Sequence, residues 1–490
     1  MTATTELPVT QPPLTPYSLE ALLNRISDEW HVRKQIFDLP TARIWSPDPE
    51  FDLSFEFLGR PAASPIGPAA GPHSQLAQNI ILAWLGGARM FELKTVQILD
   101  ELEIGRPCID METIGFNIEW SQELKIKQSL EEYVKAWMVI EILKHWKPIH
   151  PFIGEHSGPF VFDLSVGYDL AGISTPEVSF FIESMMDASD EIDRLRPQLT
   201  GHFAKFAGYH FEPRIADTVT LSTFHGCPPE EIEGITKYLM EHHGLDVVVK
   251  LNPTLLGFGN VVDILQKQLG YEHIRLSRDS FVDDLQFPRA IELIQELRDF
   301  AKERDRKFGI KLTNTLVVQN DKGFLPDDPM YLSGPPLHVL ATALLDELIN
   351  TLPNNTLMVE GHAGDVQVSW SAGITRENFA TSIGMGVAPA TVCSDLLQPG
   401  GYGRIKPMLK RLTDNMKAAG VNDLAGWRRH EWDRAKAAGF LGPVEAHLHE
   451  LTKGELREKY HHEAHKDGPR QVDHELEMWG CVACNFCVTV

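Results

Sequence analysis

Short apolar runs alternate along this chain with stretches in which apolar residues recur every three or four positions. The span 217–257 shows the pattern most clearly, because residues 218–221 and 247–249 are rich in β-branched side chains. Between them, Ile232, Ile235 and Leu239 recur at helical spacing. Such runs predict strands, and the spacing between them predicts a helix. The span therefore predicts a strand, helix, strand unit of a parallel sheet.

Six further apolar runs also predict strands, and the segments between them show helical periodicity. They lie at residues 64–71, 88–96, 160–168, 308–315, 366–374 and 390–397. Eight such units predict an α/β fold, a (β/α)₈ TIM barrel with insertions. The alternative is a doubly wound sheet, which rarely holds eight parallel strands and would be expected to carry a GxGxxG turn that is not found here.

The acidic character of the chain narrows its possible partners. The formal net charge is −23 over 490 residues, which would repel nucleic acid and anionic membranes. No apolar run reaches the ~20 residues of a membrane span, and the first residues lack the features of a secretory signal. Three single cysteines and one terminal cluster are unlike a disulfide framework. We therefore expect a folded cytoplasmic protein in a reducing compartment.

Polar groups follow the apolar runs at the edge where parallel barrels place their chemistry. Lys94 and Lys250 come directly after strands, where a buried ammonium group is costly unless it meets an anion or a polar cofactor. The alternative is that each lysine pairs with a carboxylate such as Glu92 or extends to solvent. The turns at 371–374 and 392–397 follow the seventh and eighth strands, where barrels commonly bind phosphate through backbone amides.

Cys227 lies in a loop between a predicted strand and an acidic helix start. The position suits a general acid, although a lone cysteine also serves as a small buried hydrophobe. Cys108 and Cys393 are interpreted as structural. Other polar residues at the rim either hydrogen-bond a flat, amide-bearing ring or cap loops. They are Asn117, Glu119, Asn314 and Thr315.

The cysteines at the end of the chain form the most specific motif. Cys481, Cys484 and Cys487 give C-x₂-C-x₂-C, the start of the ferredoxin ligand run C-x₂-C-x₂-C-x₃-C-P. A fourth cysteine at that spacing would fall one residue beyond Val490. The motif predicts a [4Fe–4S] cluster with an incomplete ligand set in this chain. The alternative is a structural zinc site, which usually uses two separated pairs of ligands.

These patterns divide the chain into four expected parts. The residues before the barrel include a helical periodicity over 18–37 and predict an N-terminal helical arm. The stretches 107–123 and 321–336 are expected to be loops within the barrel. The parts are an N-terminal arm, the barrel, a C-terminal helical segment and the start of an iron–sulfur segment, at residues 1–60, 61–412, 413–478 and 479–490.

Five segments of the chain carry a family resemblance: PIGPAAGPHSQLAQNI, ELKTVQILD, LSTFHGCPPEEIE, VKLNPTLLG and KLTNTL. They resemble the N-terminal part of the YgfK family, bacterial proteins described as selenate reductase subunits, and the resemblance extends to about residue 412. More distantly, the chain is similar to the FMN barrels of dihydropyrimidine dehydrogenase and dihydroorotate dehydrogenase. Because no molybdenum-cofactor motif is recognisable, selenate reduction is not expected.

The resemblance implies FMN at the C-terminal rim of the barrel. The matching flavin positions are Ala69, Ala70 and Gly71 along the flavin, Lys94, Thr95 and Lys250 at its ring and ribityl oxygens, and Gly373 and Ser394 at its phosphate. The matching substrate positions in the pyrimidine enzyme are Asn117, Glu119, Asn314 and Thr315.

Cys227 and Pro228 match the catalytic Cys-Pro pair of the pyrimidine enzyme. The preceding residues, Phe224 to Gly226, depart from its Asn-x-Ser pattern, so pyrimidine reduction is not carried over. We expect an FMN-dependent, iron–sulfur-linked oxidoreductase that acts on an unsaturated, pyrimidine- or purine-like small molecule. The resemblance also implies a redox partner domain or subunit carrying flavin, NAD(P)H or further iron–sulfur centres. The alternative is a non-catalytic electron-transfer or scaffold subunit.

Overall fold

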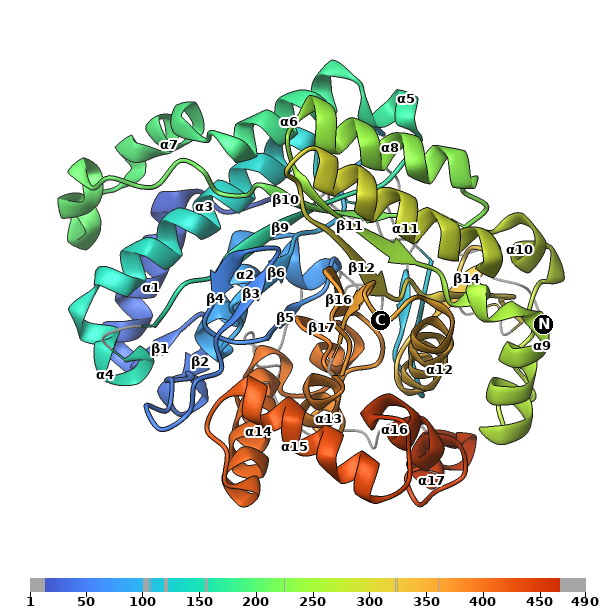
Figure 1. Ribbon diagram of the computed structural model, residues 1–490. Coiled ribbons are helices and arrows are strands. Elements are labelled where there is room, and N and C mark those ends of the chain that lie inside the picture. The colour runs from blue at the N-terminus through green and yellow to red at the C-terminus, as the bar shows by residue number, and fades with distance from the viewer. Residues whose placement is uncertain are drawn as a thin grey trace, which may run out of the picture.

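The computed structural model describes residues 14–467, apart from residues 100–104, 106, 119–121, 155–156, 224, 322, 324 and 360. Eight parallel strands lie at its centre, in the spatial order β5, β17, β16, β12, β11, β10, β9, β6 (Figure 1). The backbone N–H of Arg89 donates to Ile66 O at 3.0 Å, which links the two ends of this row. The predicted barrel is confirmed. Its strands are β5 (Ile66–Pro68), β6 (Met90–Glu92), β9 (Val161–Val166), β10 (Thr218–Ser222), β11 (Asp246–Leu251), β12 (Phe308–Leu312), β16 (Val366–Trp370) and β17 (Ala390–Val392).

Each barrel strand is followed by a helix that covers it. The helices are amphipathic where they face water: α11, for example, buries Leu293, Ile294 and Leu297 against the barrel, as the spacing of its apolar residues requires. The strands are buried except at Ser222, the last residue of β10, and therefore form nearly continuous apolar runs in the sequence. In chain order the helices are α2 (Ala77–Gly86), α3 (Ile126–His145), α6 (Pro176–Met186), α8 (Pro229–His242), α11 (Phe287–Glu303), α12 (Pro335–Thr351), α13 (Phe379–Gly384) and α14 (Ile405–Ala419).

A second, antiparallel sheet lies outside the barrel strands. It joins β13 (Leu316–Val318), β14 (Met330–Leu332), β8 (Phe116–Asn117) and β7 (Ile109–Asp110), in that spatial order. The stretches expected as loops at 107–123 and 321–336 thus contain three of its strands, and that expectation was wrong. The sheet leads directly into α12, because β14 ends three residues before that helix begins.

A hairpin of the N-terminal part packs against the barrel interior. It consists of β3 (Phe55–Phe57) and β4 (Arg60–Ala62). Phe57 and Leu58 form an apolar cluster with Met90, Val161 and Val248 from three barrel strands. Arg60 forms ion pairs with Asp217 and Asp246, which lie just before β10 and at the first residue of β11. The hairpin therefore closes the end of the barrel at which these strands begin.

The remaining N-terminal residues form the expected helical arm. Helix α1 (Leu19–Arg33) begins after Ser18, whose side chain accepts from Ala21 N, and it ends at Lys34 in the left-handed conformation (φ 56°). Leu22 and Ile26 bury its apolar face. Other short elements are β1 (Gln35–Ile36), β2 (Leu39–Pro40), β15 (Leu357–Met358), α4 (His150–Ile153), α5 (Leu170–Ile173), α7 (Ser189–Leu195), α9 (Gly257–Val261), the π-helix Val262–Gln268 and α10 (Arg278–Asp283).

The C-terminal helices pack together along one side of the barrel, coloured orange to red in Figure 1. They are α15 (Leu424–Ala437), α16 (Pro443–Thr452) and α17 (Arg457–Tyr460). Helix α14 crosses the expected boundary between residues 412 and 413 without a break. A division of the chain at that point would therefore cut the eighth helix of the barrel.

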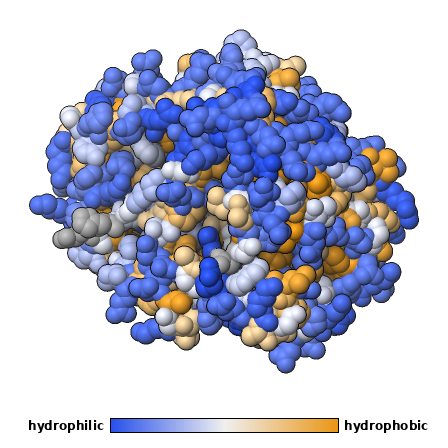
Figure 2. Space-filling view, in the orientation of Figure 1, coloured by the Kyte–Doolittle hydropathy of each residue, from blue (hydrophilic) through white to orange (hydrophobic). Residues whose placement is uncertain are grey.

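The surface is mostly polar on the face drawn in Figure 2. Figure 2 shows a face that is mostly hydrophilic, with hydrophobic residues in small groups. None of the helices in the described part of the chain combines the length and the apolarity needed to cross a bilayer.

Candidate functional site

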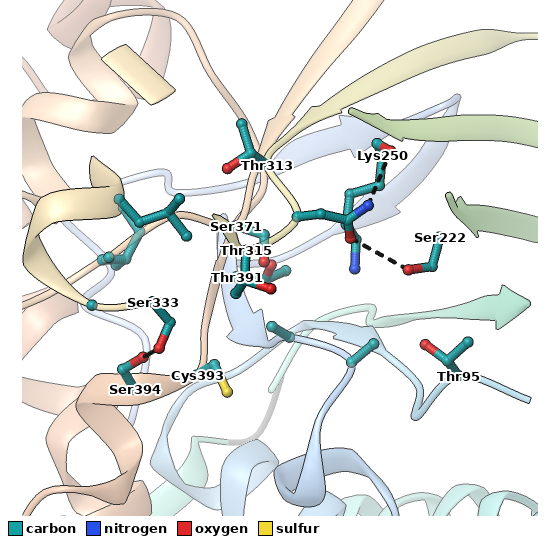
Figure 3. Close-up of a pocket in the computed structure, with 17 residues that line it drawn as sticks. Thr95, Ser222, Lys250, Thr313, Thr315, Ser333, Ser371, Thr391, Cys393 and Ser394 are labelled. Carbon is teal, nitrogen blue, oxygen red and sulfur yellow. Dashed lines mark hydrogen bonds between the residues drawn. The ribbon is translucent and has the colours of Figure 1, made fainter. Parts of the chain in front are cut away.

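A cavity opens where the barrel strands end. It encloses about 560 Å³ of empty space, its open mouth included, a size typical of small-ligand and cofactor pockets. Figure 3 shows Ser333 and Ser394 on the opposite side of this cavity from Lys250 and Ser222. We call the two sides the serine end (Ser333, Gly334, Gly373, Ile374, Ser394) and the lysine end (Thr95, Ser222, Lys250).

A buried ion cluster underlies the lysine end. Lys250 Nζ lies 2.6 Å from Glu92 Oε1, and Lys311 Nζ lies 3.0 Å from Glu92 Oε2. Glu92 and Lys311 are fully buried. Within the described part of the chain Lys311 Nζ makes no well-directed hydrogen bond, so its contact with Glu92 is essentially one of charge. Burial alone would raise the pKa of Glu92, but the two ammonium groups outweigh it and lower that pKa to about 2.

A second carboxylate, Asp163, lies inside the barrel, and its pKa is raised whereas that of Glu92 is lowered. Asp163 on β9 accepts hydrogen bonds from the hydroxyls of Thr218 and Thr220, at 2.7 and 2.6 Å. Burial raises its pKa to about 6, although the charge of Lys311 acts in the opposite direction. Near neutral pH the barrel interior therefore balances its lysines with Glu92 fully and Asp163 largely ionised.

Lys94 adds a further positive charge that no described residue matches with an anion. It follows β6 and is 3% exposed. Among the described residues its ammonium group forms no ion pair and no hydrogen bond. Its charge acts on two neighbours: it helps burial lower the pKa of His73 to about 3, and it opposes the burial that raises the pKa of Cys393. A buried ammonium without a described partner, next to the lining residue Thr95, indicates that this side of the barrel mouth suits an anionic or electron-rich ligand.

Hydrogen bonds fix the loop after β12 at the lysine end. The side-chain amide of Asn314 donates to Thr223 O and Asn252 Oδ1, each at 2.8 Å. Its carbonyl accepts from Ser222 at 3.3 Å. Beside it, the hydroxyl of Thr313 lines the cavity and has no hydrogen-bond partner in the described part of the chain. A buried hydroxyl of this kind is available to a bound ligand.

The serine end presents backbone donors. Ser333 and Ser394 share a hydrogen bond of 2.9 Å between their hydroxyls. Within the described residues, the amides of Gly373, Ile374 and Ser394 donate to no acceptor. Gly373 has φ +53°, and a Cβ there would lie 2.3 Å from Gly334 O, so only glycine fits. Clustered free amides at a strand end are typical of an anion site.

A thiol also faces the cavity. Cys393 lines it after β17, and its Sγ lies 3.8 Å from His73 Nδ1. Burial raises the thiol pKa to about 12. Gly71 approaches this sulfur closely, because a Cβ at that position would lie 3.3 Å from it.

Comparison with known proteins places this site in a family. The family model for the N-terminal TIM-barrel domain of oxidoreductase YgfK matches residues 37–439. The chain belongs to the YgfK family. It is 40% identical over 422 residues to the YgfK proteins of Escherichia coli strain K12 and of Escherichia coli O157:H7, whose name assigns them to the oxidoreductases. The match covers 81% of this chain and 39% of those relatives, so the chain spans about two fifths of their length.

Solved structures to which the chain is similar include DHODH from Eimeria tenella. The complex with ferulenol is 14% identical, with a TM-score of 0.46, and the match covers 79% of this chain and 90% of that one. The ligand-free form is 15% identical, with a TM-score of 0.45, and the match covers 77% and 90%.

The YgfK-family barrel gathers many of the predicted site residues around one cavity. Lys94 lies next to Thr95, and Gly71 lies against Cys393. Asn117 is on β8, opposite Tyr331, and is not among the residues that line the cavity. Glu119, Cys481, Cys484 and Cys487 lie outside the described residues. Those that line the cavity are Ala69, Ala70, Thr95, Lys250, Asn314, Thr315, Gly373 and Ser394.

Cys227 lies beside the cavity and not in its lining. Burial raises the pKa of its thiol to about 12, and the nearby Glu231 and Asp284 add to this effect. The neighbouring His225 is held between Asp284 Oδ2 and Thr315 O, at 2.8 and 3.0 Å. The proton-donor role of Cys227 stays a prediction.

The sequence interpretation missed two groups of this YgfK-family site. Lys311 was read only as part of an apolar strand, although a lysine in the middle of such a strand is itself a signal of a buried charge partner. Cys393 was interpreted as structural, yet it lines the cavity. Its position directly after the eighth strand was the available signal, since that is where barrels place binding residues.

Proposed function

We propose that this barrel binds FMN and acts as an oxidoreductase on an unsaturated small molecule, a pyrimidine- or purine-like ring being the class suggested by the resemblance. The observation that carries the proposal is a pair of features at the strand ends that no described residue satisfies, one next to the lining residue Thr95 and the other in the lining of the serine end. One is the buried Lys94 ammonium group, and the other is the set of free amides at Gly373, Ile374 and Ser394.

The residues present fit such a cofactor. The serine end offers amides and hydroxyls, which suit a phosphate group. The lysine end offers Lys250, the free hydroxyl of Thr313 also lines the cavity, and Lys94 lies next to the lining residue Thr95. These groups suit ring and ribityl oxygens. Glu92 holds Lys250 in place but is already shared between two lysines. Lys94 is therefore the cation available to the ligand.

FMN, when bound, supplies hydride and single-electron chemistry. Lys94 and Lys250 would stabilise negative charge at the lysine end, and the closed opposite end of the barrel keeps water out. Asn314 is held rigidly enough to orient a ring substrate, and Asn117 and Glu119 stay predicted substrate contacts. Cys227 stays the predicted proton donor.

Electron supply is part of the same proposal. Cys481, Cys484 and Cys487 supply three thiolates toward a [4Fe–4S] cluster, and a redox partner domain or subunit would deliver electrons through it. The likeness to longer relatives supports this partner, because the match covers only 39% of their length.

The experiment is a spectroscopic comparison of matched lysine variants. The full chain, purified without oxygen and titrated with FMN, should bind about one flavin per chain. Lys94→Met removes a charged hydrogen-bond donor, worth about 1.5–3 kcal/mol, and should weaken binding by about 10- to 100-fold. The control is Lys127→Met on the exposed side of α3, which should bind as the parent does.

The outcomes separate this proposal from a scaffold role. A parent chain that binds no FMN, but shows a broad iron–sulfur absorption alone, would favour a non-catalytic electron-transfer subunit. Unchanged binding by Lys94→Met would show that the lysine end does not hold the flavin.

A further inference from the structure

The loop that follows β16 is supported from behind by side chains whose contacts extend to helices outside the eight barrel units. Its residues Ser371, Gly373 and Ile374 line the cavity, the last two at the serine end. On the other side, His338 of α12 contacts Ala372 O through Nδ1 at 3.2 Å and His447 of α16 through Nε2 at 3.0 Å. Both histidines are buried. The C-terminal helices thus reach the loop through one intermediate side chain.

The hydrogen-bond directions in this chain follow from the chemistry of its members. A carbonyl oxygen can only accept, so Nδ1 of His338 carries the proton and its Nε2 is the acceptor. The Nε2–H of His447 therefore donates to His338. His338 must be neutral for this arrangement, whereas His447 can donate in either protonation state. Burial lowers the pKa of His338 to about 4 and that of His447 well below its usual value, which favours neutral rings.

A second connection runs through Asn378. Its Nδ2 donates to Gly373 O at 2.9 Å and to the hydroxyl of Tyr460 at 3.1 Å, which uses both hydrogens of the amide. Its Oδ1 accepts from Thr375 N at 2.8 Å. The ring of Tyr460 stacks on His338 with centroids 5.8 Å apart. Residues of α16 and α17 therefore support two successive carbonyl groups of the loop.

Peptide geometry determines where the backbone N–H groups of this loop point once these carbonyl groups are held. In a trans peptide the C=O and the next N–H point in opposite directions. The carbonyl of Ala372, held by His338, shares its peptide unit with the N–H of Gly373. The carbonyl of Gly373, held by Asn378, shares its unit with the N–H of Ile374. Fixing the two carbonyls turns the two free amides away from the C-terminal helices.

We propose that His447 and Tyr460 are positioning residues for an anionic group at the serine end, and that this group and the C-terminal helices stabilise each other. The inference rests on the proposed binding of FMN, whose phosphate is the anion. It adds that the helical segment after the barrel is part of the binding apparatus, although none of its residues lines the cavity described above.

The test compares FMN with riboflavin, which has the same ring but no phosphate. Dissociation constants are measured by fluorescence titration of the full chain. The parent should bind FMN much more tightly than riboflavin. His447→Leu removes the donor to His338 and should weaken FMN binding about tenfold or more, since hydrogen bonds to charged groups are each worth at least that factor. Riboflavin binding should be unchanged.

Two further variants make the result specific. His447→Gln restores an N–H donor and should recover part of the preference for FMN. Tyr460→Phe keeps the ring stacked on His338 and removes only the hydroxyl, so it should weaken FMN binding in a chain that remains folded. The control is His449→Leu, which makes the same change at an exposed position of α16.

A measurement on the parent chain needs no variant. Because coupling is reciprocal, FMN should slow amide hydrogen exchange in residues 443–460, and riboflavin should not. Binding of FMN and riboflavin with equal affinity, or of neither, would overturn both this inference and the proposed phosphate site. A parent that prefers FMN, with the same preference in His447→Leu and Tyr460→Phe, would overturn this inference alone.

Discussion

Replacement of Glu92 by Gln should destabilise the protein strongly, because it leaves two lysines without their shared carboxylate. Glu92 and Lys311 are fully buried, and Lys250 is nearly so. Lowering a carboxyl pKa from 4.5 to about 2 corresponds to about 3 kcal/mol of stabilisation. Breaking a buried ion pair by removing one partner typically costs about 3–5 kcal/mol. We therefore expect Glu92→Gln to lower the free energy of unfolding by about 3–5 kcal/mol at pH 7.

The assay is urea unfolding followed by tryptophan fluorescence. The control is Glu303→Gln, which changes a carboxylate of 75% side-chain exposure paired with Arg304 at 3.4 Å and should shift stability by less than about 1 kcal/mol. Adding Lys311→Met to Glu92→Gln removes one of the uncompensated charges and should recover part of the loss.

The pH dependence supplies an independent check on the same cluster. The folded-state pKa of Glu92 is lowered, so its contribution is fully present above about pH 4.5 and is lost as the pH falls toward 2. The difference between the parent and Glu92→Gln should shrink over that range. A difference below about 1 kcal/mol at pH 7, or no gain from Lys311→Met, would refute the charge-pairing explanation.

Two further predictions concern Asp163 and the buried thiols. Because the pKa of Asp163 is raised, its contribution to the free energy of unfolding is present below about pH 4 and is lost as the pH rises through about 6. In Asp163→Asn the urea midpoint should vary less with pH over that range. An unchanged dependence of the midpoint on pH would contradict the assignment. Cys227 and Cys393 should react with iodoacetamide at pH 8 about a thousandfold more slowly than an ordinary thiol, since burial raises each pKa from 9.0 to about 12. Mass spectrometry of labelled peptides measures both rates, and bound FMN should protect Cys393 further but not Cys227.

The barrel was predictable because its strands are buried on both faces and read as uninterrupted apolar runs. The second sheet was not, because strands of two or three residues such as β7 and β8 carry no periodicity. Its strand β14 pairs with β8 across more than two hundred residues, a distance over which local patterns say nothing. Sequence patterns likewise indicated Lys94 and Lys250 at strand ends, with Glu92 as an alternative partner. They did not indicate that Glu92 is shared between Lys250 and Lys311.

The positions of Cys227 and of the C-terminal helices show another limit. A cysteine after a strand suggested a place in the cavity, but the loop turns and leaves it outside the lining. The boundary expected at residue 412 followed the extent of the family resemblance, whereas α14 continues to Ala419. The contacts of His447 and Tyr460 depend on how helices pack, which a one-dimensional pattern does not contain.

The pairing of β5 with β17 has a consequence for synthesis of the chain on the ribosome. Ile66 to Pro68 pair with Ala390 to Val392. The first barrel strand therefore cannot pair on this side until the last strand has been synthesised. At about 5–20 residues per second, the interval is roughly 15–65 s. During it, the nascent sheet exposes an unpaired edge and apolar faces of the kind that aggregate. Newly made chains should therefore depend on chaperones until residue 392 has emerged, and finished chains should not.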